Sequence, residues 1–100
     1  MSQNRSTDDF KQLLRSIVAN NIKTIRKAKG MRQSELSRRL NVHRQQLSYY
    51  EVAKNLPPLD VVVMIAKVLD CSVADIYTPD KLDSLKNLID LDDVFSRSKN

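Results

Sequence analysis

The stretch GMRQSELSRRLNVHRQQLSYYE, residues 30–51, predicts two short amphipathic helices joined by a tight turn. The first spans about 33–40 and the second about 44–52, because apolar residues recur in each at intervals of three or four. Asn41 stands at the turn, where asparagine tolerates a positive φ better than other residues except glycine, and Val42 fills the corner. The apolar positions predicted to face inward are Leu36, Leu40, Leu47 and Tyr50.

A longer amphipathic helix precedes this stretch. Its apolar stripe predicts one helix over about 8–28, or two abutting helices if Asn20 and Asn21 interrupt it. Gly30 follows as a left-handed C-cap, where the missing Cβ removes the steric penalty. The stripe consists of Phe10, Leu13, Leu14, Ile17, Val18, Ile22 and Ile25.

Two more helices are predicted after the stretch, over about 59–69 and 73–77. Pro58 is placed just inside the first of them, and Ser72 caps the second. The β-branched run 61–63 is compatible with a strand, but no second strand exists to pair with it, so the helix is favoured. The inward stripe of the first helix is Leu59, Val62, Ile65, Ala66 and Leu69.

The sequence Thr78-Pro79-Asp80 marks a boundary, after which a last amphipathic helix is predicted over about 81–95. Its apolar residues are Leu82, Leu85, Leu88, Ile89 and Phe95. The predicted fold is therefore all-α. It comprises an N-terminal tail and helical extension over 1–19, a compact five-helix domain over 20–78, and a C-terminal helix and tail over 79–100.

Charge is unevenly distributed along the 100 residues, whose net charge is +5. Residues 22–54 hold nine basic and two acidic side chains, a net charge of +7, whereas the chain from Pro57 onward holds five basic residues and eight aspartates, a net charge of −3. The positive field therefore belongs to the half that carries the two-helix stretch, and it predicts an anionic partner.

The composition argues against catalysis and against a membrane protein. One histidine, one cysteine and one glycine leave no nucleophile–base pair, metal cluster or phosphate-binding glycine loop, so we expect neither an enzyme nor a cofactor. Cys71 is expected to act as a small buried hydrophobe. No continuous apolar run reaches the length of a membrane span and no signal-peptide pattern opens the chain, so a cytoplasmic, nucleoid-associated protein is expected.

An ordered set of residues carries a resemblance to a known family. Its members are Ile25-Arg26, Gln33, Glu35-Leu36, Asn41-Val42, Leu47, Glu51, Pro57 or Pro58 before Leu59, Ala66-Lys67-Val68-Leu69 and Ser72-Val73-Ala74-Asp75-Ile76. With this set, residues 22–77 resemble the five-helix DNA-binding domain of the Xre-type, phage repressor and Cro-like helix-turn-helix proteins.

Several positions depart from the family pattern. Arg32 and His43 replace the serine or threonine that usually caps the two short helices, and such weaker caps lower helix stability by about 1 kcal/mol each. Ser37 stands where alanine is common, and Asn41 and Ala53 stand where glycine is frequent. These departures concern local geometry rather than the fold.

The resemblance implies that helix 33–40 crosses the backbone of double-stranded DNA and that helix 44–52 enters the major groove. Arg44 and Gln45 are then the base-reading candidates, because arginine matches the paired acceptors of guanine and glutamine the acceptor–donor pair of adenine. His43 and Tyr49 flank them, but His43 could instead cap its own helix and Tyr49 could be a partly buried aromatic residue. The candidate phosphate contacts are Gln33, Arg32, Arg38, Ser48, Lys54 and Asn55.

The resemblance also implies an internal ion pair between Arg26 and Glu51, and a two-fold dimer on palindromic DNA. Three surfaces could form the dimer. The first comprises Val61, Met64, Val68 and Tyr77, the second Phe10, Leu13, Leu14 and Ile17, and the third Leu82, Leu85, Leu88 and Ile89.

The function that these expectations favour is a sequence-specific transcriptional regulator, a repressor that acts as a homodimer. One alternative is an antitoxin or restriction-modification control protein with the same domain, whose C-terminal helix binds a toxin or other protein partner. Another is a protein-interaction module without DNA binding, against which Arg44 and Gln45 argue.

Overall fold

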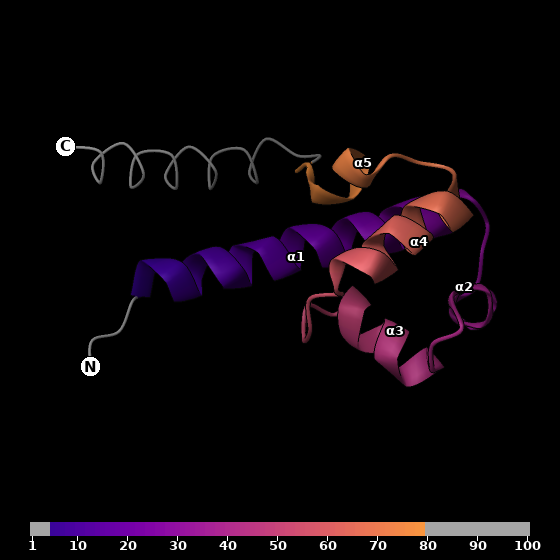
Figure 1. Ribbon diagram of the computed structural model, residues 1–100, viewed down its shortest axis with the longest axis horizontal. Coiled ribbons are helices and arrows are strands. Elements are labelled where there is room, and N and C mark those ends of the chain that lie inside the picture. The colour runs from indigo at the N-terminus through magenta and orange to yellow at the C-terminus, as the bar shows by residue number, and fades with distance from the viewer. Residues whose placement is uncertain (1–4, 80–100) are drawn as a thin grey trace.

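Residues 5–79 are described by a computed structural model, in which they form five α-helices and no strand (Figure 1). The helices are α1 (Arg5–Ala28), α2 (Gln33–Leu40), α3 (Arg44–Glu51), α4 (Leu59–Leu69) and α5 (Val73–Tyr77). The all-α prediction and the five-helix arrangement are thereby confirmed. The predicted helix over 81–95, with Leu82, Leu85, Leu88 and Ile89, lies outside the described residues.

The core forms where the apolar stripes of all five helices meet. In the view of Figure 1, helix α1 runs along the molecule, α4 overlaps its C-terminal half, α5 lies above it, and α2 and α3 lie below that half. The first turns of α1 project beyond the other helices (Figure 1). The buried apolar cluster consists of Val18, Ile22, Leu36, Leu40, Leu47, Tyr50, Val62, Ile65, Ala66, Leu69 and Ile76. Burying these side chains is the main force that holds such short helices in place.

One predicted core position is wrong. Leu59, assigned to the inward stripe of α4, is 64% exposed. It is the first residue of α4, so no preceding helical turn covers its side chain. Pro58 is also one position from its predicted place, because it is the N-cap of α4 and its carbonyl accepts the first helical hydrogen bond, from Val62 N–H at 3.0 Å.

Four residues with positive φ end helices or shape turns. Gly30 (φ 70°) and Asn41 (φ 57°) stand at predicted left-handed positions. Ala53 (φ 63°) and Asp70 (φ 55°) also adopt this conformation although they carry a Cβ. Such a conformation costs an alanine roughly 1–2 kcal/mol. Backbone hydrogen bonds close both turns, from Lys54 N–H to the Tyr49 carbonyl at 3.0 Å and from Cys71 N–H to the Ala66 carbonyl at 2.9 Å.

The start of α5 is stabilised by the predicted cap. The Ser72 hydroxyl accepts from Asp75 N–H and the Asp75 carboxylate accepts from Ser72 N–H, both at 3.0 Å. The hydrogen bond that the Ser72 N–H donates to the carboxylate, followed by the effect of the Ser72 hydroxyl, lowers the pKa of Asp75. Nearby, Cys71 is only partly buried and packs against the core, and burial, followed by the negative charge of Asp75, raises the pKa of its thiol.

None of the helices over residues 5–79 combines the length and the apolar character that a bilayer crossing requires.

Asn21 is a core residue rather than an interruption. Helix α1 passes through it without a break, which excludes the alternative of two abutting helices. Its side chain is 4% exposed, and Nδ2 donates to the carbonyl of Ile76 at 2.8 Å and to that of Thr78 at 2.7 Å. The side-chain amide of Asn21 therefore connects the middle of α1 to the end of α5 through two hydrogen bonds.

Replacing Asn21 with leucine should lower the free energy of unfolding by about 1–3 kcal/mol, because it leaves buried carbonyls without a donor. The loss is measured by urea unfolding followed by circular dichroism. Asn20→Ala is the matched control, since Asn20 is adjacent but exposed and alanine is the better helix former. Equal stability of Asn21→Leu and wild type would contradict a structural role for this amide.

Candidate nucleic-acid interface

A buried ion pair joins α1 to the end of α3. Arg26 Nε lies 2.7 Å from Glu51 Oε2, and Arg26 Nη2 donates to Glu51 Oε1 at 2.9 Å. Arg26 and Glu51 are 7% and 3% exposed. Two parallel charge-assisted hydrogen bonds fix the angle between the groups as well as their distance.

Two further hydrogen bonds connect the pair to its surroundings. Arg26 Nη1 donates to the carbonyl of Met31 at 2.8 Å, in the segment that follows Gly30. Gln33 Nε2 donates to Glu51 Oε1 at 3.0 Å, from the first residue of α2. Side chains of α1, α2 and α3 therefore meet at one carboxylate, which sets the position of α3 relative to α1 and α2.

Because Leu47, Tyr50 and Glu51 face the interior, the opposite face of α3 is directed outward. His43, Arg44 and Gln45 are exposed, and Ser48 and Tyr49 are partly buried. The Arg44 guanidinium has no hydrogen-bond or ion-pair partner within residues 5–79. Arginine and glutamine side chains thus stand beside each other at the exposed start of a short, well-anchored helix.

A chain of contacts runs along this outer face and was not foreseen from the sequence. Gln45 Nε2 donates to the Tyr49 hydroxyl at 2.9 Å, one helical turn away. The Lys54 ammonium lies 4.2 Å from the centre of the Tyr49 ring, over its face. The spacing of four residues between Gln45 and Tyr49 was visible in the sequence, but the contact with Lys54 depends on the turn after α3.

The candidate phosphate contacts fall into two groups. Arg32, Arg38, Lys54 and Asn55 are exposed, and the Arg38 side chain has no ion-pair partner among residues 5–79. Gln33 is partly buried, and its side-chain amide donates a hydrogen bond to Glu51. Its observed contact therefore stabilises the position of α3. Arg39, by contrast, pairs with Glu35 at 3.2 Å on the surface of α2.

Helices α2 and α3 both begin without a side-chain cap. Arg32 and His43 occupy the N-cap positions in extended conformation, and neither side chain accepts a hydrogen bond from its helix. The alternative in which His43 caps its own helix is therefore wrong for this structure. The first backbone N–H groups of both helices remain available to an external acceptor, and the positive end of each helix dipole favours an anion there.

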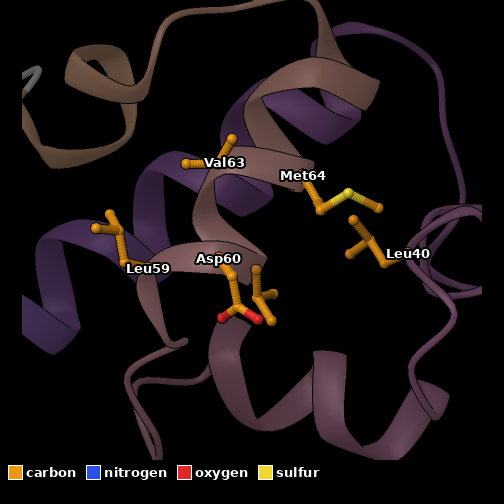
Figure 2. A pocket seen from close by; sticks show the side chains of 6 residues that line it. Leu40, Leu59, Asp60, Val63 and Met64 are labelled. Atoms are coloured by element: carbon orange, nitrogen blue, oxygen red, sulfur yellow. The ribbon is translucent and has the colours of Figure 1, made fainter.

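The residues of α4 and α5 assigned to dimerisation differ in exposure. Val61, Val68 and Tyr77 pack partly against the core of their own chain, whereas Met64 is 44% exposed. A shallow depression on α4 brings Val61 and Met64 together, and Met64 extends toward Leu40 of α2 (Figure 2). The lining residues are Leu40, Leu59, Asp60, Val61, Val63 and Met64.

The residues of the N-terminal apolar stripe of α1 also differ in burial. Ile17 is buried, and Phe10, Leu13 and Leu14 are partly buried. Within residues 5–79, four large exposed apolar side chains besides Met64 were not singled out from the sequence as a surface. They are Val52, Leu56, Leu59 and Val63, around the α3–α4 loop and the start of α4.

Comparison with known proteins identifies the family. Residues 22–76 match the Helix-turn-helix family, HTH_3, which confirms the resemblance found over 22–77. A hypothetical transcription factor, NHTF, from Neisseria is 24% identical with a TM-score of 0.65, over 86% of this chain and 92% of the other. An HTH_3 family transcriptional regulator from Vibrio cholerae is 22% identical with a TM-score of 0.63, over 67% of this chain. This chain spans 38% of the length of the Vibrio protein. No curated protein matches the sequence.

The buried pair makes a direct prediction for stability. Glu51→Ala should lower the free energy of unfolding by about 3–5 kcal/mol, because it leaves the Arg26 charge buried and unpaired. The matched control is Glu35→Ala, which breaks the exposed pair with Arg39 and should cost roughly 0.3–0.5 kcal/mol. Thermal unfolding of both variants checks the difference. A Glu51→Ala protein with the same melting temperature as wild type would rule out the structural role of the pair.

Proposed function

Because this chain belongs to the Helix-turn-helix family HTH_3, we propose that it is a sequence-specific transcriptional regulator that binds double-stranded DNA through α3. The observation that carries the proposal is the outer face of α3, where Arg44 and Gln45 are exposed on a helix fixed by the buried Arg26–Glu51 pair. A rigid helix with two long readout side chains suits the major groove, whose base edges present distinct donor and acceptor patterns.

In this proposal, Arg44 donates two hydrogen bonds to a guanine and Gln45 pairs with the acceptor and donor of an adenine. His43 lies beside them at the N-cap position of α3. Because its side chain does not cap the helix, the ring is free to contact a base or a phosphate. Tyr49 completes the set of base-proximal residues on the same face.

Backbone contacts supply affinity and register. Arg32, Arg38, Lys54 and Asn55 are exposed on α2 and on the turns next to α2 and α3, and Ser48 and Gln33 lie partly buried between them. Such contacts neutralise phosphates and release counterions, so binding weakens steeply as salt increases. The excess of positive charge over residues 22–54 supports this part of the proposal.

The proposed regulator is a repressor that acts by occupying its operator. It binds as a homodimer to a palindrome whose half-sites lie about one helical turn, roughly 34 Å, apart. Residues 20–78 form the DNA-binding domain, and the segments 1–19 and 79–100 extend it. The exposed Met64 beside Val61 supports self-association through α4, and the proposed surface also includes Val68 and Tyr77.

The readout is tested by selecting bound DNA from a random pool and comparing single variants. Arg44→Ala and Gln45→Ala should each relax the preferred base at one position per half-site, since a bidentate contact contributes roughly 1–3 kcal/mol of discrimination. Arg38→Ala should weaken all sequences alike and reduce the salt slope by about 1. Lys67→Ala removes the same charge from the exposed side of α4 and should change neither property.

Two results would contradict this proposal. If the wild-type protein enriches no sequence, it is not a sequence-specific DNA-binding protein. If Arg44→Ala lowers affinity uniformly, without changing the preferred sequence, Arg44 binds phosphate and does not read a base.

Self-association is tested separately by sedimentation of the full chain. Met64→Asp should shift a dimer toward monomer, because dimerisation would then bury an unpaired charge at an apolar surface. Thr24→Asp adds the same charge at an exposed position of α1 and should leave the dimer intact. A dimer that tolerates Met64→Asp would exclude the α4 surface and favour one of the terminal apolar stripes.

A further inference from the structure

We propose that Tyr49 is a specificity-determining positioning residue, which acts by holding the Gln45 carboxamide in one orientation toward DNA. The inference rests on the proposed function and concerns how the same helix face achieves its base preference. It differs from a direct contact between Tyr49 and DNA, because the hydroxyl of Tyr49 acts through another side chain.

The first step is the hydrogen bond between the two side chains. Gln45 Nε2 donates to the Tyr49 hydroxyl at 2.9 Å, although both side chains lie on the outer face of α3. An exposed glutamine otherwise samples many rotamers, and rotation of its carboxamide exchanges a donor for an acceptor. The bond to Tyr49 restricts both freedoms before any DNA is bound.

The second step is that Tyr49 is itself held in place. Its carbonyl accepts from the N–H groups of Lys54 at 3.0 Å and Asn55 at 3.3 Å, which closes the turn after α3. Ala53 adopts a left-handed conformation, which turns the backbone so that these two N–H groups reach the Tyr49 carbonyl. The turn places the Lys54 ammonium 4.2 Å from the centre of the Tyr49 ring, where the cation is attracted to the ring face.

The Gln45 carboxamide keeps hydrogen-bonding groups that Tyr49 does not use. A glutamine amide has two N–H donors, and one of them is used by the Tyr49 hydroxyl. The second N–H and Oε1 remain for DNA, and a carboxamide supplies the donor and acceptor that match N7 and the amino group of adenine. Tyr49 therefore orders a pair of groups that would otherwise have to be ordered by the DNA itself.

Removing only the hydroxyl tests this role. Tyr49→Phe should reduce the preference at the base position read by Gln45 by roughly 3- to 10-fold, which corresponds to one neutral hydrogen bond. The salt slope and the preferences at other positions should stay unchanged. Tyr50→Phe is the matched control, because it removes a hydroxyl from the next residue of α3, whose side chain faces the core.

A double-mutant comparison separates positioning from direct contact. Selection is repeated with Gln45→Ala and with the Gln45→Ala/Tyr49→Phe double variant. If Tyr49 acts through Gln45, the double variant has the same base preferences as Gln45→Ala. If Tyr49→Phe still changes a preference when Gln45 is absent, Tyr49 touches DNA itself and the inference is wrong.

The free protein gives a second readout. The side-chain amide of Gln45 should show restricted motion by nuclear magnetic resonance in wild type and increased motion in Tyr49→Phe, whereas equal motion in both would overturn the inference. Failure of the proposed function is a different result, in which the wild-type protein enriches no sequence at all. If wild type and Tyr49→Phe enrich the same sequence equally strongly, only the role of Tyr49 is wrong.

Discussion

The ion pair between Arg26 and Glu51 determines how this domain presents its outer surface. Taking two charges out of water is costly, and a buried pair is often no more stabilising than apolar residues of the same volume. What the pair provides is geometry, because two hydrogen bonds of 2.7 and 2.9 Å allow one relative placement of α1 and α3. Bonds from Arg26 to Met31 and from Gln33 to Glu51 extend that constraint to the α1–α2 segment and to α2.

Helix α3 needs such a constraint because it cannot define its own position. It has eight residues, and isolated helices of that length are marginal in water. Its inward side chains Leu47 and Tyr50 bury apolar surface, but apolar contacts alone tolerate sliding and rotation more readily than a directional charged contact does. The Glu51 anchor at one end therefore determines which side chains at the other end, Arg44 and Gln45 among them, are exposed.

The sequence was sufficient for the helices and for most of the core, because the spacing of apolar residues reports directly which face of a helix is buried. It was not sufficient where the answer depends on a neighbouring element. Leu59 fits the apolar spacing of α4 yet is exposed at the first turn, and Asn21 looks like a helix interruption yet donates to two carbonyls at the end of α5. The contact of Lys54 with Tyr49 likewise follows a left-handed Ala53, a conformation that alanine itself does not indicate, although glycine is frequent at this position in the family.

The helices differ in how their N-termini are capped, and α4 begins without a side-chain cap, at Pro58. Helix α5, which takes no part in the proposed interface with DNA, begins with a complete capping box from Ser72 and Asp75. Helices α2 and α3 begin with Arg32 and His43, which leave the first N–H groups unbonded by a side chain at a cost of about 1 kcal/mol per helix. A serine at either position would occupy those N–H groups, whereas a basic residue leaves them open and adds a basic side chain beside them. The weaker caps therefore leave those N–H groups open to an external acceptor, and burial of the apolar core supplies the stability that the caps do not.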